Sequence, residues 1–241
     1  MAHKTVLLKE TIDCLALEKG DIYLDATLGS GGHALEVWNR TKGGVEIIGI
    51  DTDQMSLAIA KENLELSGVK YKTVELNFRN IEKVLELIDI EAPSKIVFDL
   101  GWSSPQFEEG GRGFSFQKDE PLIMSLKSNV GEEDTTAHDV VNSWSEENLA
   151  TIIYEYGEEK YSRRIAKAIV EARKIGQIKT SLELAEIIKK AVPIFYRFGR
   201  IHPATKTFQA IRIAVNDELR ALEEGLRGAL KKKKKGGRVA V

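Results

Sequence analysis

The stretch Ile22-Tyr-Leu-Asp25-Ala-Thr-Leu-Gly-Ser-Gly-Gly-His33 decides the fold of this 241-residue chain. A short strand-forming run is followed by a glycine-rich turn and then by a helix-forming segment that extends to about Arg40. Glycines allow the backbone to bend sharply and to approach a ligand closely, because they carry no Cβ. The stretch therefore predicts the first strand, the ligand-binding turn and the first helix of a nucleotide-binding fold.

Strands and helices continue to alternate after this stretch. Runs rich in β-branched residues predict strands at residues 45–50, 71–74 and 95–100. Apolar residues at helical spacing predict one helix that stops at Gly68 and another at residues 81–88. Strand, helix and strand in this order are typical of parallel βαβ units, so we expect an α/β fold with a Rossmann-like sheet.

The alternation ends after residue 100. Residues 101–112 are rich in Gly, Ser, Pro and Glu, which predicts an ordered loop or the edge of an active site. Helical patterns without strands then follow up to about residue 201. We expect an α-helical insertion at residues 111–202 within a Rossmann-like domain formed by residues 1–110 and 203–241.

The carboxyl-terminal part predicts one long helix and a short strand. After Pro203, apolar residues from Phe208 to Leu230 share one helical stripe. Gly236-Gly237 then predicts a turn, and Arg238-Val-Ala-Val241 the start of a fifth strand. Strands usually run about 5–6 residues, so we expect the C-terminal strands of the sheet to be missing from this sequence.

Composition narrows the class of protein. The chain has 35 basic and 37 acidic residues, so no global charge demands a polyanionic partner. Its single cysteine, Cys14, excludes an internal disulfide and a cysteine-based metal cluster. No segment has the length of a signal peptide's apolar region or of a membrane span, and His33, His138 and His202 have no metal-ligand spacing. We expect a soluble, cytoplasmic protein without a metal ion.

The glycine-rich turn predicts an adenosine-type cofactor. Gly29, Gly31 and Ala34 fit the loose form of the dinucleotide-binding fingerprint. Asp51 ends the second predicted strand roughly 20 residues later, where a carboxylate accepts hydrogen bonds from both ribose hydroxyls. NAD and S-adenosyl-L-methionine both use this arrangement.

Asp25 favours the second cofactor. It ends the first predicted strand just before the glycines, where its charge would repel a pyrophosphate but attract an ammonium and a sulfonium group. We therefore expect S-adenosyl-L-methionine, with an NAD-dependent oxidoreductase as the alternative. A structural role also stays open, since Asp25 is well placed to cap the backbone of the turn.

Other candidates follow the third and fourth strands. Phe78 is predicted either to pack on the adenine ring or to join the core. Asp99 ends the fourth strand at the edge where open α/β sheets bind ligands. In the next loop, Trp102 is a candidate either for stacking on a flipped base or for packing, and Gln106 for contacting a base edge or the cofactor.

Several blocks together carry a family resemblance. They are, in chain order, His3-Lys-Thr-Val-Leu-Leu-Lys-Glu10, Asp25 to His33, Gly49-Ile-Asp51, Asp99-Leu-Gly-Trp-Ser-Ser-Pro-Gln106, Arg112-Gly-Phe-Ser-Phe116, Tyr156-Gly-Glu-Glu159, Arg163-Arg-Ile-Ala166 and His202-Pro-Ala-Thr-Lys-Thr-Phe-Gln-Ala-Ile-Arg-Ile-Ala-Val-Asn-Asp-Glu218. Read together, they resemble the bacterial 16S ribosomal RNA cytosine-N4 methyltransferases, the RsmH/MraW family, over nearly the whole chain.

The resemblance implies methylation of one cytidine in the decoding region of the small ribosomal subunit, and a helical insertion that recognises the substrate. It also implies a set of cofactor contacts. We add Asp25 to this set because its charge would attract the cofactor's ammonium and sulfonium groups. The residues that match the family's motif are Gly31, Gly32, His33, Asp51, Phe78, Asp99 and Gln106.

The family's pattern is not fully kept. Ile123 and Ser125 replace an acid and a base that usually follow the Arg112 block, an acid is shifted to Glu108, and the chain stops before the family's next block. A catalytically impaired relative that binds cofactor or RNA is therefore an alternative.

The expected chemistry needs a proton acceptor near a cytosine amine. That amine is a weak nucleophile, so the enzyme must orient it and accept its proton. Asp99 is the candidate to accept a hydrogen bond from that amine, with Ser103 and Ser104 or backbone carbonyls assisting; the alternative is that Asp99 contacts the cofactor alone. Basic residues of the insertion, among them Arg163, Arg197 and Arg200, are expected either to contact phosphates or to form a solvated face.

Overall fold

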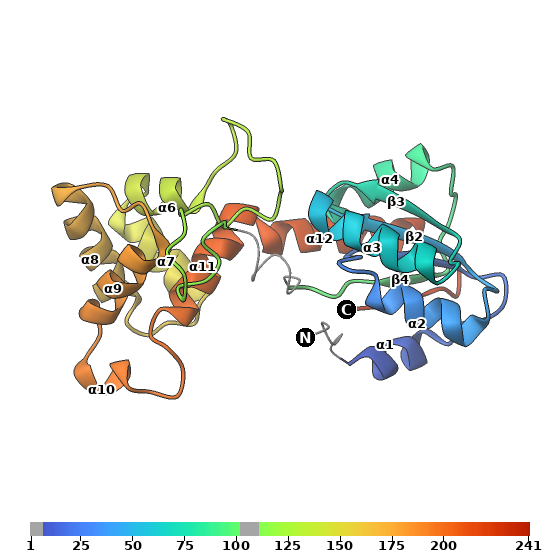
Figure 1. Cartoon of the computed structure of the whole chain (residues 1–241), viewed down its shortest axis with the longest axis horizontal. Helices are drawn as coiled ribbons and strands as arrows, with labels where there is room; N and C mark the ends of the chain where they lie inside the picture. Colours follow the sequence, from blue (N-terminus) through green and yellow to red (C-terminus); the bar gives the residue numbers. More distant parts are fainter. Residues whose placement is uncertain (1–6, 102–110) are drawn as a thin grey trace. The chain divides into compact units, whose positions relative to one another are not determined.

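The computed structural model describes residues 7–101 and 111–241 (Figure 1). The chain forms two compact units. The first contains Met1–Gln106 and Leu219–Val241, and the second contains Phe107–Glu218. The chain thus leaves the first unit once and returns to it near its end.

The first unit is built on a parallel sheet of five strands in the order β3-β2-β1-β4-β5. The strands are β1 (Ile22–Asp25), β2 (Glu46–Asp51), β3 (Tyr71–Glu75), β4 (Lys95–Val97) and β5 (Arg238–Ala240). In the ladder, Asp25 lies opposite Gly49 of β2 and Val97 of β4. The prediction of a Rossmann-like α/β sheet is confirmed, and residues 238–240 do form a fifth strand.

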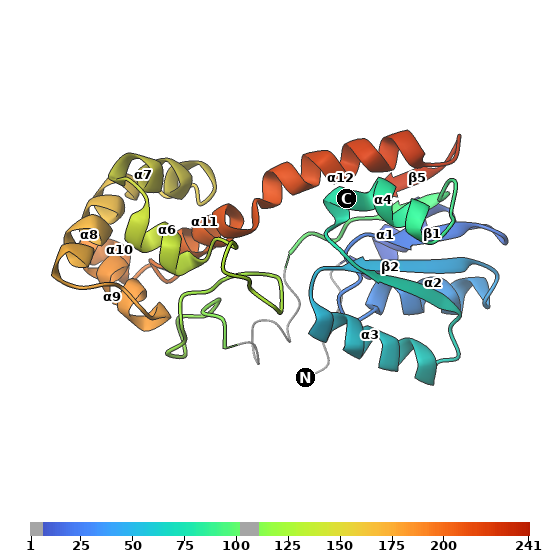
Figure 2. The ribbon, with the colours of Figure 1, turned by 90° about the horizontal axis from the view of Figure 1, so that it is seen from above.

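Helices cover both faces of the sheet (Figure 2). The elements in the first unit are α1 (Leu8–Leu15), α2 (Gly32–Thr41), α3 (Gln54–Leu66), the 3-10 helix η1 (Phe78–Asn80), α4 (Ile81–Leu87) and α12 (Glu218–Lys232). Successive strand residues point to opposite faces, so Tyr23 packs with α1, α2 and α3, whereas Leu24 packs with α4 and α12. This doubly wound arrangement leaves the carboxyl ends of β1, β2 and β4 at one edge.

Strand β4 is shorter than the sequence predicts. A strand was expected over residues 95–100, but β4 ends at Val97. The backbone N–H of Asp99 donates to Thr27 Oγ1 at 2.7 Å instead of to a neighbouring strand. Residues after Val97 therefore turn toward the glycine-rich turn.

The second unit is helical. Its helices are α6 (Ala137–Ser143), α7 (Glu146–Glu155), α8 (Ser162–Ile175), α9 (Ser181–Ala191), α10 (Ile194–Arg197) and α11 (Thr205–Asn216). Thr136 and Thr180 begin α6 and α9 with capping boxes, and Pro193 follows the end of α9. Across residues 7–101 and 111–241, no helix combines the length and the apolarity that a membrane span requires.

The predicted long helix after Pro203 is interrupted. Asp217 adopts a left-handed conformation with φ 49°, which ends α11 and starts α12 at the next residue. Phe208 and Ile211 of α11 belong to the helical core, whereas Ala229 of α12 belongs to the core of the sheet.

The expected boundary at residue 203 is therefore displaced. The second unit extends to Glu218, because α11 packs with the helices of that unit. The Asn216 side chain also accepts from Leu126 N and donates to Met124 O, both at 2.8 Å, which attaches the end of α11 to the loop at residues 124–126.

Candidate functional site

The turn between β1 and α2 is shaped by two glycines. Gly31 has φ 85°, a left-handed conformation that residues with a side chain rarely adopt. Gly49 of β2 lies below the turn, where a Cβ would come within 2.5 Å of Leu28 Cδ2. Leu28 N donates to Ile50 O at 2.9 Å, so the turn is fastened to the end of β2. The turn is thereby held at the carboxyl edge of the sheet, against the end of β2.

Asp51 joins the end of β2 to this turn. Gly29 N donates to its Oδ2 at 2.8 Å, and Asp53 N donates to its Oδ1 at 2.9 Å. Burial raises the pKa of Asp51, whereas these backbone N–H groups act in the opposite direction. Each carboxylate oxygen has a second lone pair, so Asp51 keeps the capacity to accept hydrogen bonds from a diol.

Asp25 lies at the end of β1 but is enclosed. It is 1% exposed, accepts from Tyr23 Oη at 3.1 Å, and accepts from Thr27 N at 3.2 Å. Burial, aided by the charges of Asp99 and Asp51, raises the pKa of Asp25 to about 7, whereas the hydrogen bonds from Thr27 and Tyr23 act in the opposite direction. The contact with Thr27 is the turn-capping role that the sequence left open.

Asp99 and His33 face each other across the same edge. The Asp99 side chain is 44% exposed, whereas His33, in the first turn of α2, is 4% exposed. His33 Nδ1 lies 3.8 Å from Asp99 Oδ2, which is longer than a hydrogen bond. Burial lowers the pKa of His33, which favours a neutral imidazole at pH 7, and its Nε2 is buried without a hydrogen-bond partner among the described residues.

Phe78 lies beyond the end of β3 and is half-buried. Its ring meets that of Phe98 edge to face, with the centroids 5.6 Å apart. Gly225 of α12 packs against it, since a Cβ at that position would come within 2.8 Å of Phe78 Cδ2. One side of the ring is therefore held by the core on the α4 and α12 face of the sheet.

The structure thus brings Asp25, Gly31, Asp51 and Asp99 to one edge through neighbouring strand ends. The candidates Trp102, Ser103 and Gln106, and the shifted acid Glu108, lie outside the described residues. Ile123 and Ser125 belong to the second unit, where the carbonyl of Ser125 accepts from Arg112 Nη1 at 3.2 Å.

Two site residues were not anticipated from the sequence. Thr27 anchors the backbone of Asp99, and Tyr23 donates to Asp25. A signal existed for Tyr23, because residues two apart on a strand point to the same face. Thr27 gave no such signal, since its partner is 72 residues away.

The three carboxylates give this edge a negative character. Such an edge suits a cationic ligand whose ribose reaches Asp51, and disfavours a pyrophosphate beside Asp25. Among residues 7–101 and 111–241, no group of three or more His, Cys, Asp or Glu side chains is arranged to hold a metal ion.

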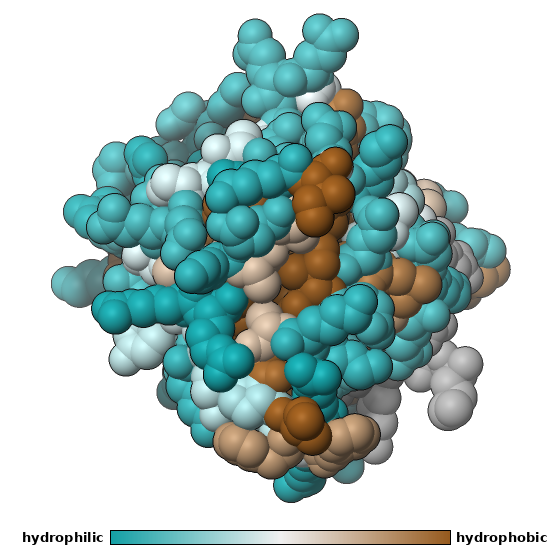
Figure 3. All heavy atoms as spheres, turned by 90° about the vertical axis from the view of Figure 1, so that its left-hand side faces the viewer, coloured by the Kyte–Doolittle hydropathy of each residue, from teal (hydrophilic) through white to brown (hydrophobic). Residues whose placement is uncertain are grey.

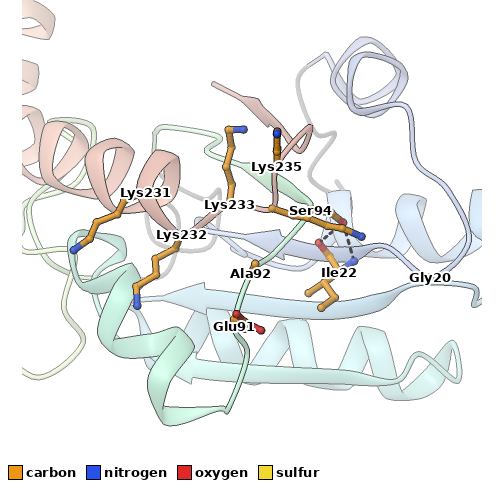
Figure 4. Close-up of a pocket in the computed structure, with 10 residues that line it drawn as sticks. Gly20, Ile22, Glu91, Ala92, Ser94, Lys231, Lys232, Lys233 and Lys235 are labelled. Carbon is orange, nitrogen blue, oxygen red and sulfur yellow. Dashed lines mark hydrogen bonds between the residues drawn. The ribbon is translucent and has the colours of Figure 1, made fainter.

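A cavity of about 690 Å³ lies at the opposite edge of the sheet, where β1 and β4 begin (Figure 4). It is lined by Gly20, Ile22, Glu91, Ala92, Ser94, Lys231, Lys232, Lys233, Lys234 and Lys235. Lys231 and Lys232 extend toward α4, where they pair with Glu82 and Glu86 at 2.7 and 3.4 Å. No residue of the glycine-rich turn lines this cavity.

Comparison with known proteins identifies relatives. The model of the MraW methylase family matches residues 1–241. The chain is 45% identical over 239 residues to the ribosomal RNA small subunit methyltransferase H of Symbiobacterium thermophilum, covering 99% of this chain and 74% of that protein. Among solved structures, an rRNA methylase from Streptococcus thermophilus is 18% identical with a TM-score of 0.33, covering 42% of this chain and 57% of that one. TrmN from Thermus thermophilus is 22% identical with a TM-score of 0.34, covering 38% of this chain and 26% of its own. On the match of the family model to every residue, the chain belongs to the MraW methylase family.

Proposed function

We propose that this protein transfers a methyl group from S-adenosyl-L-methionine to the N4 amine of a cytidine in 16S ribosomal RNA. The observation that carries the proposal is the carboxyl edge of the sheet, where Asp51 holds the turn through Gly29 N and Asp99 stands exposed two residues beyond the end of β4. The substrate class follows from the name of the 45% identical relative. The small ribosomal subunit is then the partner, and the cytoplasm the place of action.

The residues present fit the cofactor. The turn around Gly31, and Leu28 seated over Gly49, form a backbone cradle that a Cβ at either glycine would disturb. Asp51 would accept from the ribose hydroxyls, and Gly31, Gly32 and His33 would approach the cofactor through their backbone. The cofactor supplies an electrophilic methyl group on a sulfonium and leaves as S-adenosylhomocysteine.

The other cofactor contacts have unequal support. Phe78 is half-buried, and we propose that it packs on the adenine with the part of its ring that does not meet Phe98. Asp25 would act through the charge of its ionised form, since its oxygens are enclosed by Tyr23 and Thr27 and its pKa is about 7. Gln106 is retained from the family motif alone.

Asp99 is the proposed proton acceptor in the transfer. In that step the N4 lone pair forms the new N–C bond, the S–C electron pair stays on sulfur, and the amine proton passes to the carboxylate. The 44% exposure of Asp99 leaves its oxygens accessible, and the Asp99 N–H bond to Thr27 Oγ1 fixes its backbone. Ser103 is proposed to assist in holding the amine.

A transfer assay tests this function. The chain is incubated with methyl-labelled S-adenosyl-L-methionine and small ribosomal subunits that lack the modification, and the RNA is digested to nucleosides. Labelled N4-methylcytidine is expected. Cofactor binding without labelled RNA would instead favour the impaired relative motivated by Ile123 and Ser125, and nicotinamide binding would favour the oxidoreductase.

A further inference from the structure

The segment at residues 194–201, which contains α10, exposes its apolar side chains. Phe195 and Phe198 are 72% and 84% exposed, and Ile194 and Ile201 are exposed as well. These four side chains are a large part of an eight-residue segment, and clustered exposed apolar groups mark interaction sites more often than scattered ones do. We call residues 194–201 the aromatic segment.

The polar side chains of the aromatic segment hold it to the second unit. Tyr196 Oη donates to Glu159 Oε2 at 2.7 Å, and Glu159 is fully buried. Arg197 donates to the carbonyls of Lys190 and Val192 at 3.0 and 3.1 Å, at the end of α9. The segment is therefore anchored by its polar groups, and its phenylalanines face solvent from a fixed backbone.

The stretch of sequence that contains the aromatic segment is rich in basic residues. Between Glu186 and Asp217 the sequence contains no acidic residue. The basic residues of this stretch are Lys189, Lys190, Arg197, Arg200, Lys206 and Arg212. Lys160 Nζ also lies over the Tyr196 ring, 5.3 Å from its centroid. Acidic groups also contact this stretch: Glu159 accepts from Tyr196 Oη, and Glu186 pairs with Lys189 Nζ at 3.3 Å.

Figure 3 shows one face of the second unit, with apolar side chains gathered at its lower margin. Helix α10 lies at the same height in Figure 1. Hydrophilic side chains flank this patch on the same face. Aromatic rings among cations fit a partner that has both flat apolar faces and negative charge. An apolar protein surface offers no such charge, and charged residues are depleted at the centres of protein–protein interfaces.

We propose that the aromatic segment is a docking surface for single-stranded RNA, with unpaired bases stacked on Phe195 and Phe198 and phosphates facing Lys189 and Arg200. Unpaired bases stack on aromatic side chains without regard to sequence, while basic residues follow the backbone. The inference rests on the proposed function, which makes RNA the substrate, and it names the surface of the helical unit that holds a strand of that substrate.

Binding of a fluorescent single-stranded oligoribonucleotide of about 12 nucleotides to the full chain tests the proposal, measured by fluorescence anisotropy. Replacing both phenylalanines, Phe195→Leu with Phe198→Leu, keeps the apolar character but removes the rings, and is expected to weaken binding by at least about tenfold. Phe198→Tyr keeps a ring and is expected to stay within about twofold. The matched control is Ile175→Ala, another exposed apolar position of the same unit, which should leave binding unchanged.

Four outcomes overturn the proposal: no binding by the unmodified chain, unchanged binding by the leucine variant, equal loss in Ile175→Ala, or failure of Phe198→Tyr to bind. Sedimentation velocity, which measures the oligomeric state, tests whether a second copy of the chain covers the aromatic segment instead. A dimer that the leucine variant converts to monomer, with unchanged RNA affinity, would mean that a second copy covers the segment. Thermal unfolding checks that each variant folds.

The transfer assay separates this proposal from the proposed function. If methyl transfer to ribosomal RNA is intact and insensitive to the leucine variant, the docking surface is wrong and the enzyme stands. If the oligoribonucleotide binds through the aromatic segment but no methyl group is transferred, the enzyme assignment is wrong and the docking surface stands.

Discussion

The two edges of the parallel sheet have opposite electrostatic character. At the carboxyl edge, Asp25, Asp51 and Asp99 lie beside the turn that contains Gly29 and Gly31. At the amino edge, residues 231–235 are five lysines that line a cavity. The cavity by itself therefore does not mark the cofactor site, because the edge that fits a cationic adenosine ligand is the acidic one.

The two edges also differ in how their charges are held. Asp51 accepts backbone N–H bonds from Gly29 and Asp53. The lysines of the amino edge instead make exposed ion pairs, such as Lys231 with Glu82. Exposed ion pairs contribute little to stability and do not hold their side chains in one fixed geometry. A preorganised site is therefore expected only at the carboxyl edge.

The largest expected effect is at Asp99. Asp99→Ala removes the proposed proton acceptor and is expected to lower the rate of methyl transfer by about 100-fold or more, as loss of a general base does. Single-turnover transfer to small ribosomal subunits measures it, with Asp99→Glu as the variant that keeps a carboxylate. Full activity of Asp99→Ala would show that the acceptor lies elsewhere.

Asp51→Asn is expected to have the next largest effect. The amide keeps the shape but loses the charge and one acceptor oxygen, so S-adenosyl-L-methionine should bind about 10-fold more weakly or worse, the cost of a hydrogen bond to a charged group. Isothermal titration calorimetry measures the affinity. An unchanged dissociation constant would contradict the role of Asp51.

Asp25 makes the acidic edge sensitive to pH. Folding raises the pKa of Asp25 from 3.8 to about 7, so the folded state keeps a proton that the unfolded state releases. The contribution of Asp25 to stability is then intact below pH 4 and is lost as the pH rises toward 7, at up to ~1.4 kcal/mol per pH unit.

Asp25→Asn mimics the protonated form and removes this dependence. Denaturant unfolding of both proteins between pH 4 and 8 should show that the variant gains stability relative to the unmodified chain as the pH rises. Parallel pH profiles for the two proteins would mean that Asp25 ionises freely in the folded state.

The smallest effect is expected at the amino edge. Changing Lys233→Gln together with Lys235→Gln removes two charges of the cavity and should leave the affinity for S-adenosyl-L-methionine within about twofold, since the charge effect of exposed groups is screened. Calorimetry under the conditions used for Asp51→Asn gives the comparison. A tenfold loss of affinity would instead indicate that the cofactor binds at the amino edge.

Much of the sheet could be predicted, because its signals are local. The run Ile22-Tyr-Leu-Asp25 and the β-branched residues before Asp51 have strand-forming side chains bounded by glycines, and both strands occur where expected. The turn around Gly31 was predictable for the same reason, since its left-handed conformation requires a residue without a Cβ.

The break at Asp217 could not be predicted from periodicity. The apolar stripe continues from Phe208 to Leu230, yet its two halves pack in different units. Only tertiary packing distinguishes them. The contact between Thr27 and Asp99 also depends on tertiary structure, because the two residues meet across neighbouring strand ends. The exposure of Phe195 and Phe198 is likewise not indicated by any local sequence pattern.

Hydrogen–deuterium exchange with and without S-adenosyl-L-methionine tests most directly where the cofactor binds. It needs no substitution and compares both edges in one experiment. We expect slower exchange of the backbone amides at residues 28–33 and 51–54 when the cofactor is present, and unchanged exchange at residues 231–237. Protection confined to residues 231–237, with none in the glycine-rich turn, would contradict this expectation.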